Sequence, residues 1–251
     1  MNDGKDTVSF GYSEVAPEEK PALVREIFSS VASRYDLMND LMSAGIHRLW
    51  KDDFVAWLNP QPGTAVLDLA GGTGDIAFRI AARTRAKGRP AEITVCDSNL
   101  AMLEEGQRRP EAKTAKLTWL CADAENLPIA DASQDACTMA FGIRNATRLD
   151  RALKEAYRVL KPGGRFLCLE FSRVTVPGLD RLYELYSFAV LPRLGEIVTG
   201  NGAAYRYLAE SIRRFPAQRP FANAIAAAGF SQVKFRNLSG GIAAIHSGWK
   251  V

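Results

Sequence analysis

The sequence predicts an α/β fold: a doubly wound, mostly parallel sheet of seven strands, with an N-terminal helical lid and a helical insertion before the last two strands. Three observations predict this architecture. An apolar strand runs directly into a glycine-rich turn at residues 65–75. Four further strand-like segments follow at regular spacing, most of them separated by helical patterns, which is typical of a parallel sheet. Two more strand-like segments, at residues 231–238 and 241–249, close the chain.

The first strand and its turn predict a binding site for a nucleotide-type cofactor. The run AVLDLA is short and apolar and suits a central parallel strand. Gly71, Gly72 and Gly74 give the turn freedom at positive φ and let a ligand approach the backbone. Asp68 would attract a cation or an amide and repel a phosphate, which disfavours a dinucleotide. A dinucleotide motif also wants glycine where this chain has Ala77, although alanine is sometimes allowed. By itself, the turn could equally be an ordinary strand-turn-helix corner.

Later strands place polar residues at the same edge of the sheet. We predict strands at residues 92–97, 117–121, 135–141 and 165–171, and a helix at 99–107. Asp97 ends the second strand, where an acid is the usual partner of ribose hydroxyls. The polar turn at residues 122–128 can offer a carboxylate and backbone groups to an adenine. Because ligands bind at the carboxyl ends of such strands, we expect one site to contain Asp68, Thr73, Asp97, Asp123 and Phe141.

Three segments lie outside the predicted sheet. Residues 22–60 carry apolar residues at helical spacing and form the expected lid over the cofactor. Residues 174–215 form the helical insertion, and their apolar stretch from Leu182 to Pro192 suits burial, a partner surface or a lipid-lined groove. Helices packed on the sheet edge account better for most of these side chains. Residues 1–21 are polar and acidic and are expected to be flexible.

Composition favours a single domain of 251 residues that buries one sizeable core, since 47% of its residues are hydrophobic. The net charge of +4 is too small for a dedicated nucleic-acid binder; it could favour an anionic membrane surface or simply reflect a solvated exterior. The four cysteines fall in or at the ends of predicted strands, so we expect buried, reduced thiols of a cytosolic protein. No signal peptide, membrane span or cluster of metal ligands is predicted.

The ordered strands, glycine turn and acidic residues resemble the class I S-adenosylmethionine (SAM) methyltransferases, which have a Rossmann-like fold. Two blocks resemble one family more specifically. Residues 35–51 (YDLMNDLMSAGIHRLWK) and 141–146 (FGIRNA) look like signatures of the UbiE-type C-methyltransferases of ubiquinone and menaquinone biosynthesis. The resemblance extends from about residue 24 to the C-terminus. Members often carry serine where this chain has Ala140, so a hydroxyl contact to SAM is lost there.

The resemblance implies a set of cofactor-binding residues. The family's SAM-contacting positions match Thr73, Asp97 and the pair Asp123–Ala124. Together with the residues of the first strand and its turn, the expected cofactor-binding set is Asp68, Gly72, Thr73, Gly74, Asp97, Asp123 and Ala124. In the lid, Asn39 or Asp40 could cap a helix or touch the methionine end of SAM.

The implied reaction is methyl transfer from SAM to a ring carbon of a prenylated benzoquinol, naphthoquinol or both. Ionising an adjacent ring hydroxyl makes that carbon nucleophilic, so a base or an oxyanion stabiliser is expected. Arg144 could hold a phenolate or order a water, and Asn145 could orient the ring oxygen; the family implicates both positions and the one matching Tyr35. For Arg144 the alternative is a structural ion pair. His47 is the alternative base, ranked lower because it begins a predicted helix.

The expected partners are a prenylated quinol and, transiently, a membrane surface; a homodimer or a quinone-biosynthetic complex stays open, and no nucleic acid is expected. The expected location is the cytoplasm, peripheral at the inner face of the membrane. Two other functions are considered. One is methylation of another small phenolic or lipid acceptor, for which the pocket lined by Tyr35, Arg144 and Tyr186 would differ. The other is a non-catalytic SAM-binding subunit, against which the intact cofactor residues and Arg144 argue.

Overall fold

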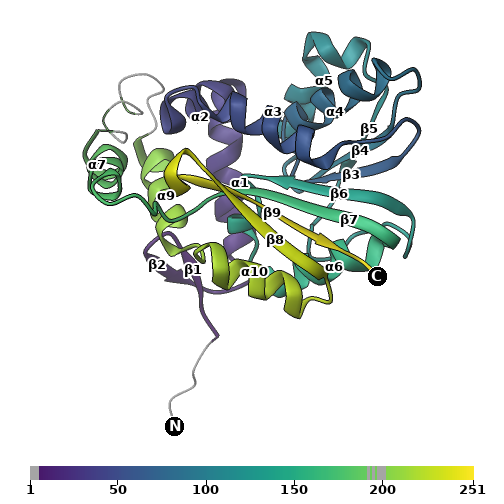
Figure 1. The fold of residues 1–251 in the computed structure, drawn as a ribbon. Helices are drawn as coiled ribbons and strands as arrows, with labels where there is room; N and C mark the ends of the chain where they lie inside the picture. Colours follow the sequence, from purple (N-terminus) through teal and green to yellow (C-terminus); the bar gives the residue numbers. More distant parts are fainter. Residues whose placement is uncertain (1–5, 191–192, 194–195, 197–201) are drawn as a thin grey trace.

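A computed structural model describes residues 6–190, 193, 196 and 202–251 of the chain. Its centre is a seven-stranded sheet in the order β5-β4-β3-β6-β7-β9-β8 (Figure 1). The first five of these strands pair in parallel, and β9 and β8 are antiparallel to their neighbours. The strands are β3 (Ala65–Leu69), β4 (Glu92–Asp97), β5 (Leu117–Cys121), β6 (Gln134–Ala140), β7 (Leu160–Phe171), β8 (Ser231–Leu238) and β9 (Ala243–Trp249). The predicted seven-stranded, mostly parallel sheet is confirmed.

The sheet reverses its winding direction between β3 and β6. From β3 the chain moves outward through β4 to β5, and then returns to add β6 on the other side of β3. Asp68 therefore lies between Val95 of β4 and Thr138 of β6. The carboxyl ends of β3, β4 and β6 meet at this switch point, which is where open α/β sheets bind ligands.

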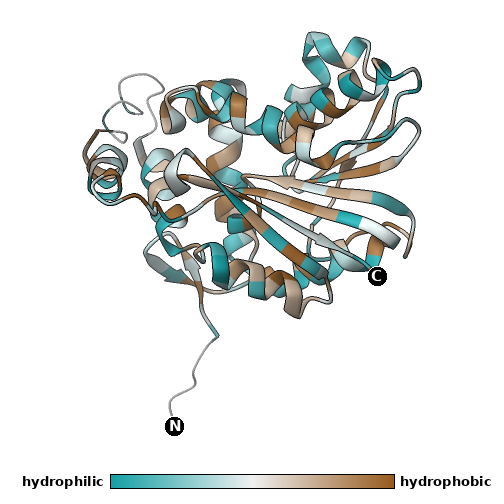
Figure 2. Ribbon diagram, in the orientation of Figure 1, coloured by the Kyte–Doolittle hydropathy of each residue, from teal (hydrophilic) through white to brown (hydrophobic). Residues whose placement is uncertain are grey.

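Helices cover both faces of the sheet because successive strand residues point to opposite faces. Val66 belongs to the core cluster that faces α3, α4 and α5, whereas Leu67 belongs to the cluster that faces α6 and α10. Figure 2 shows hydrophobic residues concentrated along the strands and on parts of the helices. The bounds of the flanking helices are α3 (His47–Leu58), α4 (Asp75–Arg85), α5 (Leu100–Arg108), α6 (Leu149–Val159) and α10 (Gln218–Ala227).

The expected lid and insertion pack against one another near the carboxyl edge of the sheet (Figure 1). The lid contains α1 (Lys20–Val31), a 3-10 turn at 32–34 and α2 (Tyr35–Ser43), and continues into α3. The insertion contains α7 (Leu179–Leu185), a π-helical turn η4 (Tyr186–Val190) and α9 (Gly202–Arg214). The Tyr186 hydroxyl donates to the carbonyl of Leu41, which ties the two segments together. Several residues of the predicted insertion lie outside the described residues: 191–192, 194–195 and 197–201.

A two-stranded hairpin occupies part of the N-terminal segment that was expected to be flexible. Its strands are β1 (Val8–Phe10) and β2 (Ser13–Val15), while residues 1–5 lie outside the described residues. The Phe10 ring stacks on that of Tyr207 in α9, with 4.5 Å between centroids. Such a contact gives a short hairpin the apolar support that it lacks alone. The hairpin thus covers α9 near the carboxyl edge of the sheet.

Candidate active site

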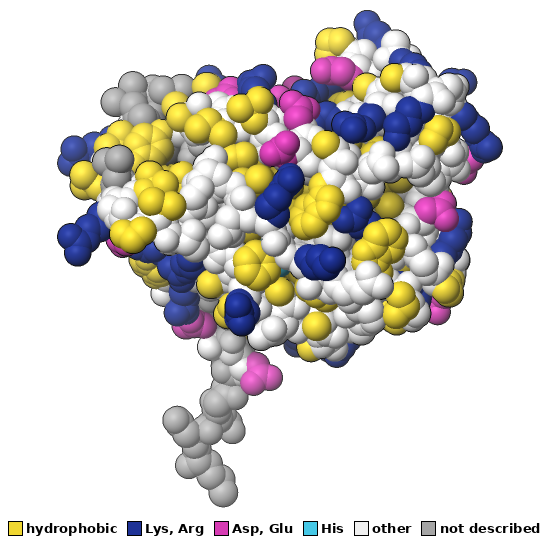
Figure 3. All heavy atoms as spheres, in the orientation of Figure 1, with side chains coloured by type: hydrophobic (Ala, Val, Ile, Leu, Met, Phe, Trp, Pro, Cys, Tyr) yellow, Lys and Arg dark blue, Asp and Glu magenta, His cyan; other side chains and the backbone are white. Residues whose placement is uncertain are grey.

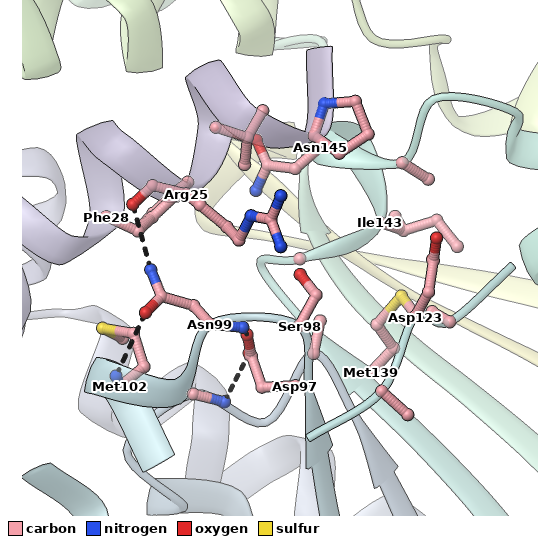
Figure 4. Close-up of a pocket in the computed structure, with 18 of the residues that line it drawn as sticks. Arg25, Phe28, Asp97, Ser98, Asn99, Met102, Asp123, Met139, Ile143 and Asn145 are labelled. Carbon is pink, nitrogen blue, oxygen red and sulfur yellow. Dashed lines mark hydrogen bonds between the residues drawn. The ribbon is translucent and has the colours of Figure 1, made fainter. Parts of the chain in front are cut away.

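A cavity of about 330 Å³ opens at the carboxyl ends of β3 to β6 and under α1 (Figure 4). Its wall combines the glycine turn after β3, the ends of β4 and β5, the loop after β6 and one face of the lid. Of the residues predicted from the sequence, those lining it are Tyr35, Gly72, Asp97, Asp123, Ala124, Phe141 and Asn145. Asp68, Thr73, Gly74 and Arg144 lie behind this wall.

The glycine turn places backbone groups at the cavity floor. Gly72 has a φ of +54° and Gly74 a φ of +78°, conformations that L side chains rarely adopt. A Cβ on Gly72 would also come within 3.0 Å of the Cε of Met102. The backbone angle therefore favours glycine at position 72, and a larger residue would also displace the end of the Met102 side chain beside the cavity.

Asp97 is fixed at the end of β4 by two backbone donors. The amide of Gly72 donates to its Oδ2 at 2.9 Å, and the amide of Asn99 donates to its Oδ1 at 2.8 Å. Because an ionised carboxylate offers about four lone-pair sites, acceptor capacity is left over for a ligand in the cavity. Burial raises the pKa of Asp97 to about 6, against the effect of these amides. The carboxylate is thus oriented to accept hydrogen bonds from hydroxyl groups.

Asp68 supports the turn from below and does not line the cavity. Its side chain is fully buried, and its Oδ1 accepts a 2.7 Å hydrogen bond from the Thr138 hydroxyl on β6. A Cβ on Gly71 would lie 3.0 Å from Asp68 Oδ2, so the carboxyl group packs directly under the turn. Burial raises the pKa of Asp68 to about 7. The geometry gives Asp68 a positioning role for the turn.

Thr73 and Gly74 also shape the turn from outside the cavity. The Thr73 hydroxyl accepts from Arg109 Nη1 at 3.2 Å, and the same nitrogen contacts Asp36 Oδ2 at 3.1 Å. Asp36 belongs to α2, so this chain of contacts joins the lid to the turn. Gly74 precedes α4, and a Cβ there would come 2.8 Å from the Trp119 ring. Both residues hold the turn in place through the lid and β5.

The end of the cavity near β5 combines a carboxylate with apolar side chains. Asp123 Oδ1 accepts from the Glu125 amide at 2.9 Å, which closes the turn around Ala124. Asp123, Ile143 and Met139 lie near one another in Figure 4. Cys121 also lines this end and is exposed. The expectation that all four cysteines are buried was wrong for Cys121, because β5 is the edge strand of the sheet and Cys121 ends it.

Arg25 and Asn99 are polar lining residues that the sequence analysis did not identify. Arg25 extends from α1 into the cavity (Figure 4). Asn99 caps α5 through its Oδ1 and donates through Nδ2 to the Arg25 carbonyl at 3.1 Å, which fastens the lid to the end of β4. The sequence does contain a signal for Asn99, because it comes two residues after the acidic residue that ends a strand and directly before a predicted helix. Nothing in the apolar spacing of α1 identified Arg25.

The loop after β6 carries a strained residue. Phe141 has a φ of +58°, which is rare for a bulky side chain and is typical of functional turns. A Cβ on Gly142, the next residue, would lie 2.4 Å from that of Ala70, so the loop crosses close over the turn after β3. This crossing leads directly into the 3-10 turn η3 (Ile143–Asn145). The strained turn thereby sets the position of Arg144 and Asn145.

Arg144 forms the buried ion pair that the sequence analysis kept as the alternative to a catalytic role. Its Nη1 contacts Glu170 Oε1 at 2.8 Å, and the two side chains are 3% and 1% exposed. The same nitrogen donates to the carbonyl of Phe141. Arg144 Nε is buried and has no hydrogen-bond partner among the described residues. The guanidinium is therefore anchored on one side and retains an unused donor.

The charge of Arg144 acts on the pKa values of three buried tyrosines. Burial raises the pKa values of Tyr35, Tyr183 and Tyr207 to about 12, and in each case the charge of Arg144 acts in the opposite direction. The Tyr207 hydroxyl donates to Asn145 Oδ1 at 3.0 Å. Tyr35, Asn145 and Arg144 thus meet beside the cavity, although only the first two line it.

His47 lies in the lid, away from the cavity lining. It is 2% exposed, and its Nε2 lies 2.8 Å from Asp40 Oδ1. Burial and the nearby charge of Lys51 lower the pKa of His47, which favours the neutral ring. Asn39 is buried in the same helix as Asp40, and neither lines the cavity. These contacts fit a packing role for His47. They agree with the sequence analysis, which ranked His47 below Arg144 as a candidate catalytic residue.

Comparisons with known proteins agree with this geometry. The model of the ubiE/COQ5 methyltransferase family matches residues 14–250. The ubiquinone/menaquinone biosynthesis C-methyltransferase UbiE of Brucella anthropi is 56% identical over 247 residues, covering 97% of this chain and 93% of that protein. The protein of the same name from Brucella abortus is also 56% identical, over 97% of this chain and 91% of its own length.

Solved structures share the fold at low sequence identity. A SAM-dependent methyltransferase from Thermotoga maritima, described as a possible histamine N-methyltransferase, superposes with a TM-score of 0.61 at 23% identity, over 90% of this chain and 99% of its own. Phosphoethanolamine N-methyltransferase 2 of Haemonchus contortus, solved with SAM, gives a TM-score of 0.56 at 15% identity, over 80% of this chain and 52% of its own. These likenesses support the class I methyltransferase fold.

Proposed function

The chain belongs to the ubiE/COQ5 methyltransferase family, and from this premise we propose that it methylates a ring carbon of a prenylated quinol in ubiquinone or menaquinone biosynthesis. The enzyme is a SAM-dependent C-methyltransferase. The observation that carries the choice of acceptor is the position of Tyr35, Arg144 and Asn145 at one side of the cofactor cavity. This arrangement offers a cation and hydrogen-bonding groups to an ionising phenol.

The residues around the cavity fit SAM. Asp97 retains acceptor capacity for the ribose hydroxyls, and Asp123 with Ala124 would face the adenine. The backbone of Gly72 leaves room for the methionine portion. When bound, SAM supplies an electrophilic methyl group on its sulfonium. Asp68, Thr73 and Gly74 keep the turn in the shape that this binding needs.

The remaining chemistry falls to the protein side chains. Arg144 is always protonated at physiological pH, so it stabilises a ring oxyanion by charge and does not itself take a proton. Asn145 is oriented by Tyr207 and can orient the ring oxygen. Tyr35 keeps its proton, because burial raises its pKa to about 12, and so it can donate a hydrogen bond. Alignment of the acceptor carbon with the methyl group then contributes much of the acceleration.

Complementation tests the proposal in the cell. A bacterial strain that lacks its own quinone C-methyltransferase should accumulate demethylated quinones, and expression of this chain should restore the methylated forms. Chromatography of extracted quinones reports the result and separates benzoquinones from naphthoquinones. Continued accumulation of both demethylated quinones, with the folded protein present, would contradict the proposal.

We expect SAM affinity to depend on pH through Asp97. Burial raises the folded-state pKa of this carboxyl to about 6, so the ionised fraction falls as the pH drops through that value. A protonated carboxyl is a weaker acceptor for ribose hydroxyls. Affinity should therefore fall by up to about tenfold per pH unit below about pH 6. Calorimetric titration from neutral pH downward measures this.

The matched control for the pH dependence is Asp97→Asn. An amide does not titrate, so the variant should bind SAM weakly, with little change in affinity over the same range. An equally steep dependence in the variant would assign the effect to another group.

We further propose a transient membrane contact through an apolar patch, defined as Leu37, Ile46 and Leu49 of the lid together with Leu185 and Val190 of the insertion. All five are exposed, with Leu49 at 67% and Leu185 at 61%. Figure 3 shows hydrophobic side chains gathered over α2 and α7, with basic side chains nearby. No helix among the described residues is long and apolar enough to cross a membrane. A prenylated acceptor resides in the bilayer, so this apolar patch would bring the active site to it.

Liposome sedimentation tests this contact. The protein should sediment with vesicles containing anionic lipid and should be released by salt, since the attachment is weak and partly electrostatic. Leu49→Glu should reduce binding, whereas Phe235→Glu, on the remote strand β8, should not. Equal binding by both variants, or resistance to salt and carbonate, would contradict the proposed surface.

A further inference from the structure

Glu170 is a buried carboxylate to which the proposed mechanism assigns no role. It lies one residue before the end of β7 and is 1% exposed. Its Oε1 accepts from the Phe171 amide at 2.9 Å and from Arg144 Nη1 at 2.8 Å. The carboxylate therefore holds the guanidinium from the side of the sheet, behind the wall of the cofactor cavity.

The groups around this pair define its charge balance. The charges of Arg144 and Glu170 both act on the pKa values of Tyr35 in α2 and Tyr207 in α9. The charge of Glu170 also acts on the pKa of Cys168 in β7. Burial raises the pKa values of these tyrosines and of the cysteine well above neutrality, so they are uncharged. Within the described residues, Glu170 is paired with Arg144 alone. The Arg144–Glu170 pair thus consists of one permanent positive charge and one carboxylate that neutralises it.

An ionised acceptor would disturb this balance. A ring oxyanion beside Arg144 would place a second negative charge next to a single buried cation. Two anions sharing one cation at low dielectric repel one another, and one of them binds a proton. Arginine cannot take the proton, because it is not deprotonated in proteins. Glu170 is the carboxylate already in contact with the guanidinium.

We infer that Glu170 becomes protonated when the acceptor hydroxyl ionises, so that the ring oxyanion replaces its carboxylate as the counter-ion of Arg144. This inference rests on the proposed function. The acceptor O–H bond breaks and a carboxyl O–H bond forms, with no change in the net charge of the site. After methyl transfer, the ring carbon loses its own proton to solvent, the ring oxygen is protonated again and Glu170 returns to its ionised form. Per turnover, one proton leaves and no electrons are exchanged with an outside reagent.

Glu170 contacts Arg144 and does not line the cofactor cavity, so it is a positioning residue for the guanidinium that also holds the proton. Burial, which the charge of Arg144 opposes, raises the pKa of Glu170 and makes its carboxylate a better proton acceptor than an exposed one. A purely structural pair would hold Arg144 equally well whether or not the acceptor ionises. The two roles therefore differ in their pH dependence.

The test compares Glu170→Gln with the unaltered enzyme across pH, using labelled SAM and a demethylated quinol kept reduced. Glutamine still accepts a hydrogen bond from Arg144 but cannot take the proton. Its turnover should be at least tenfold lower near neutrality and should rise by about tenfold per pH unit as the acceptor ionises in solution. The unaltered enzyme should show a much flatter profile. Glu170→Asp should keep the flat profile at a reduced rate.

Asp135→Asn is the matched control, because Asp135 pairs with Lys161 at the opposite edge of the same sheet. It should match the unaltered enzyme in rate and profile. SAM affinity should be unchanged in all variants. A Glu170→Gln profile parallel to that of the unaltered enzyme would overturn the inference while leaving the proposed function intact. Failure of the unaltered enzyme to methylate any prenylated quinol would instead refute the proposed function.

A second measurement needs no variant. An ionisable phenol that lacks a methylatable position should bind as its phenolate, detected by its absorption at longer wavelength, below its pKa in solution. Calorimetry in buffers of different ionisation enthalpy should show no net proton release, because Glu170 keeps the proton. A neutral bound phenol, or release of one proton per phenolate bound, would overturn the inference even if Glu170→Gln failed to fold.

Discussion

Arg144→Lys is expected to retain SAM affinity and to lose about 10²–10⁴ in turnover, the range for an oxyanion or acid–base contribution. The Arg144 guanidinium contacts Glu170 and the Phe141 carbonyl through one nitrogen while its Nε stays unused. Lysine keeps the charge but carries all its donors on one atom, so an ammonium bound to Glu170 and Phe141 has no separate donor like Nε to present to an acceptor. Steady-state methyl transfer, with SAM affinity measured separately, tests this expectation.

Lysine is chosen over alanine because of the buried pair. Removing one partner of such a pair typically costs about 3–5 kcal/mol of stability, which would confuse folding with chemistry. His47→Ala is the control, since His47 is bonded to Asp40 in the lid and does not line the cavity. Its turnover should stay well above that of Arg144→Lys. Near-normal turnover for Arg144→Lys together with an inactive His47→Ala would shift the active site toward the lid.

Asp97→Ala should weaken SAM binding by about tenfold or more, since a hydrogen bond to a charged group contributes about 1.5–3 kcal/mol. The variant also leaves the amides of Gly72 and Asn99 without their acceptor, which loosens the glycine turn. Calorimetry measures the affinity, and the melting temperature verifies the fold.

Asp131→Ala is the control for the loss of a carboxylate. Asp131 pairs with Arg158 at the protein surface and does not line the cavity. Its SAM affinity should equal that of the unaltered protein. Unchanged affinity in a folded Asp97→Ala protein would remove Asp97 from the cofactor site.

Most of the sheet could be predicted because each strand is a short apolar run bounded by turn residues. The bounds of β4, β5 and β8 agree with the prediction, and β3, β6 and β9 differ by one or two residues at one or both ends. The prediction was wrong for the start of β7, which begins at Leu160 and not at residue 165, because residues 160–164 continue the strand. The hairpin β1–β2 could not be predicted, because its few apolar residues gain support from distant segments, α9 and η4. Local patterns carry no information on such a contact between distant segments.

The site was predicted less completely, for a similar reason. Strand ends and glycines are local features, so Asp97 and Gly72 could be placed at the cavity from the sequence. The burial of Arg144 depends on Glu170, which lies 26 residues away on the next strand. The exposure of Cys121 depends on β5 being the sheet edge, which is a property of the strand order. The burial of Arg144 and the exposure of Cys121 both depend on which strands lie side by side, and this is determined by the tertiary fold.

The most direct test of the account is methyl transfer by the purified protein from labelled SAM to a demethylated, prenylated quinol kept reduced. We predict label on a ring carbon of the quinol, with negligible transfer to the oxidised quinone, because the oxidised ring is a poor carbon nucleophile. Mass spectrometry of the product locates the methyl group. Folded protein that binds SAM but leaves both benzoquinol and naphthoquinol unmethylated, or that places the methyl group on a ring oxygen, would contradict the account.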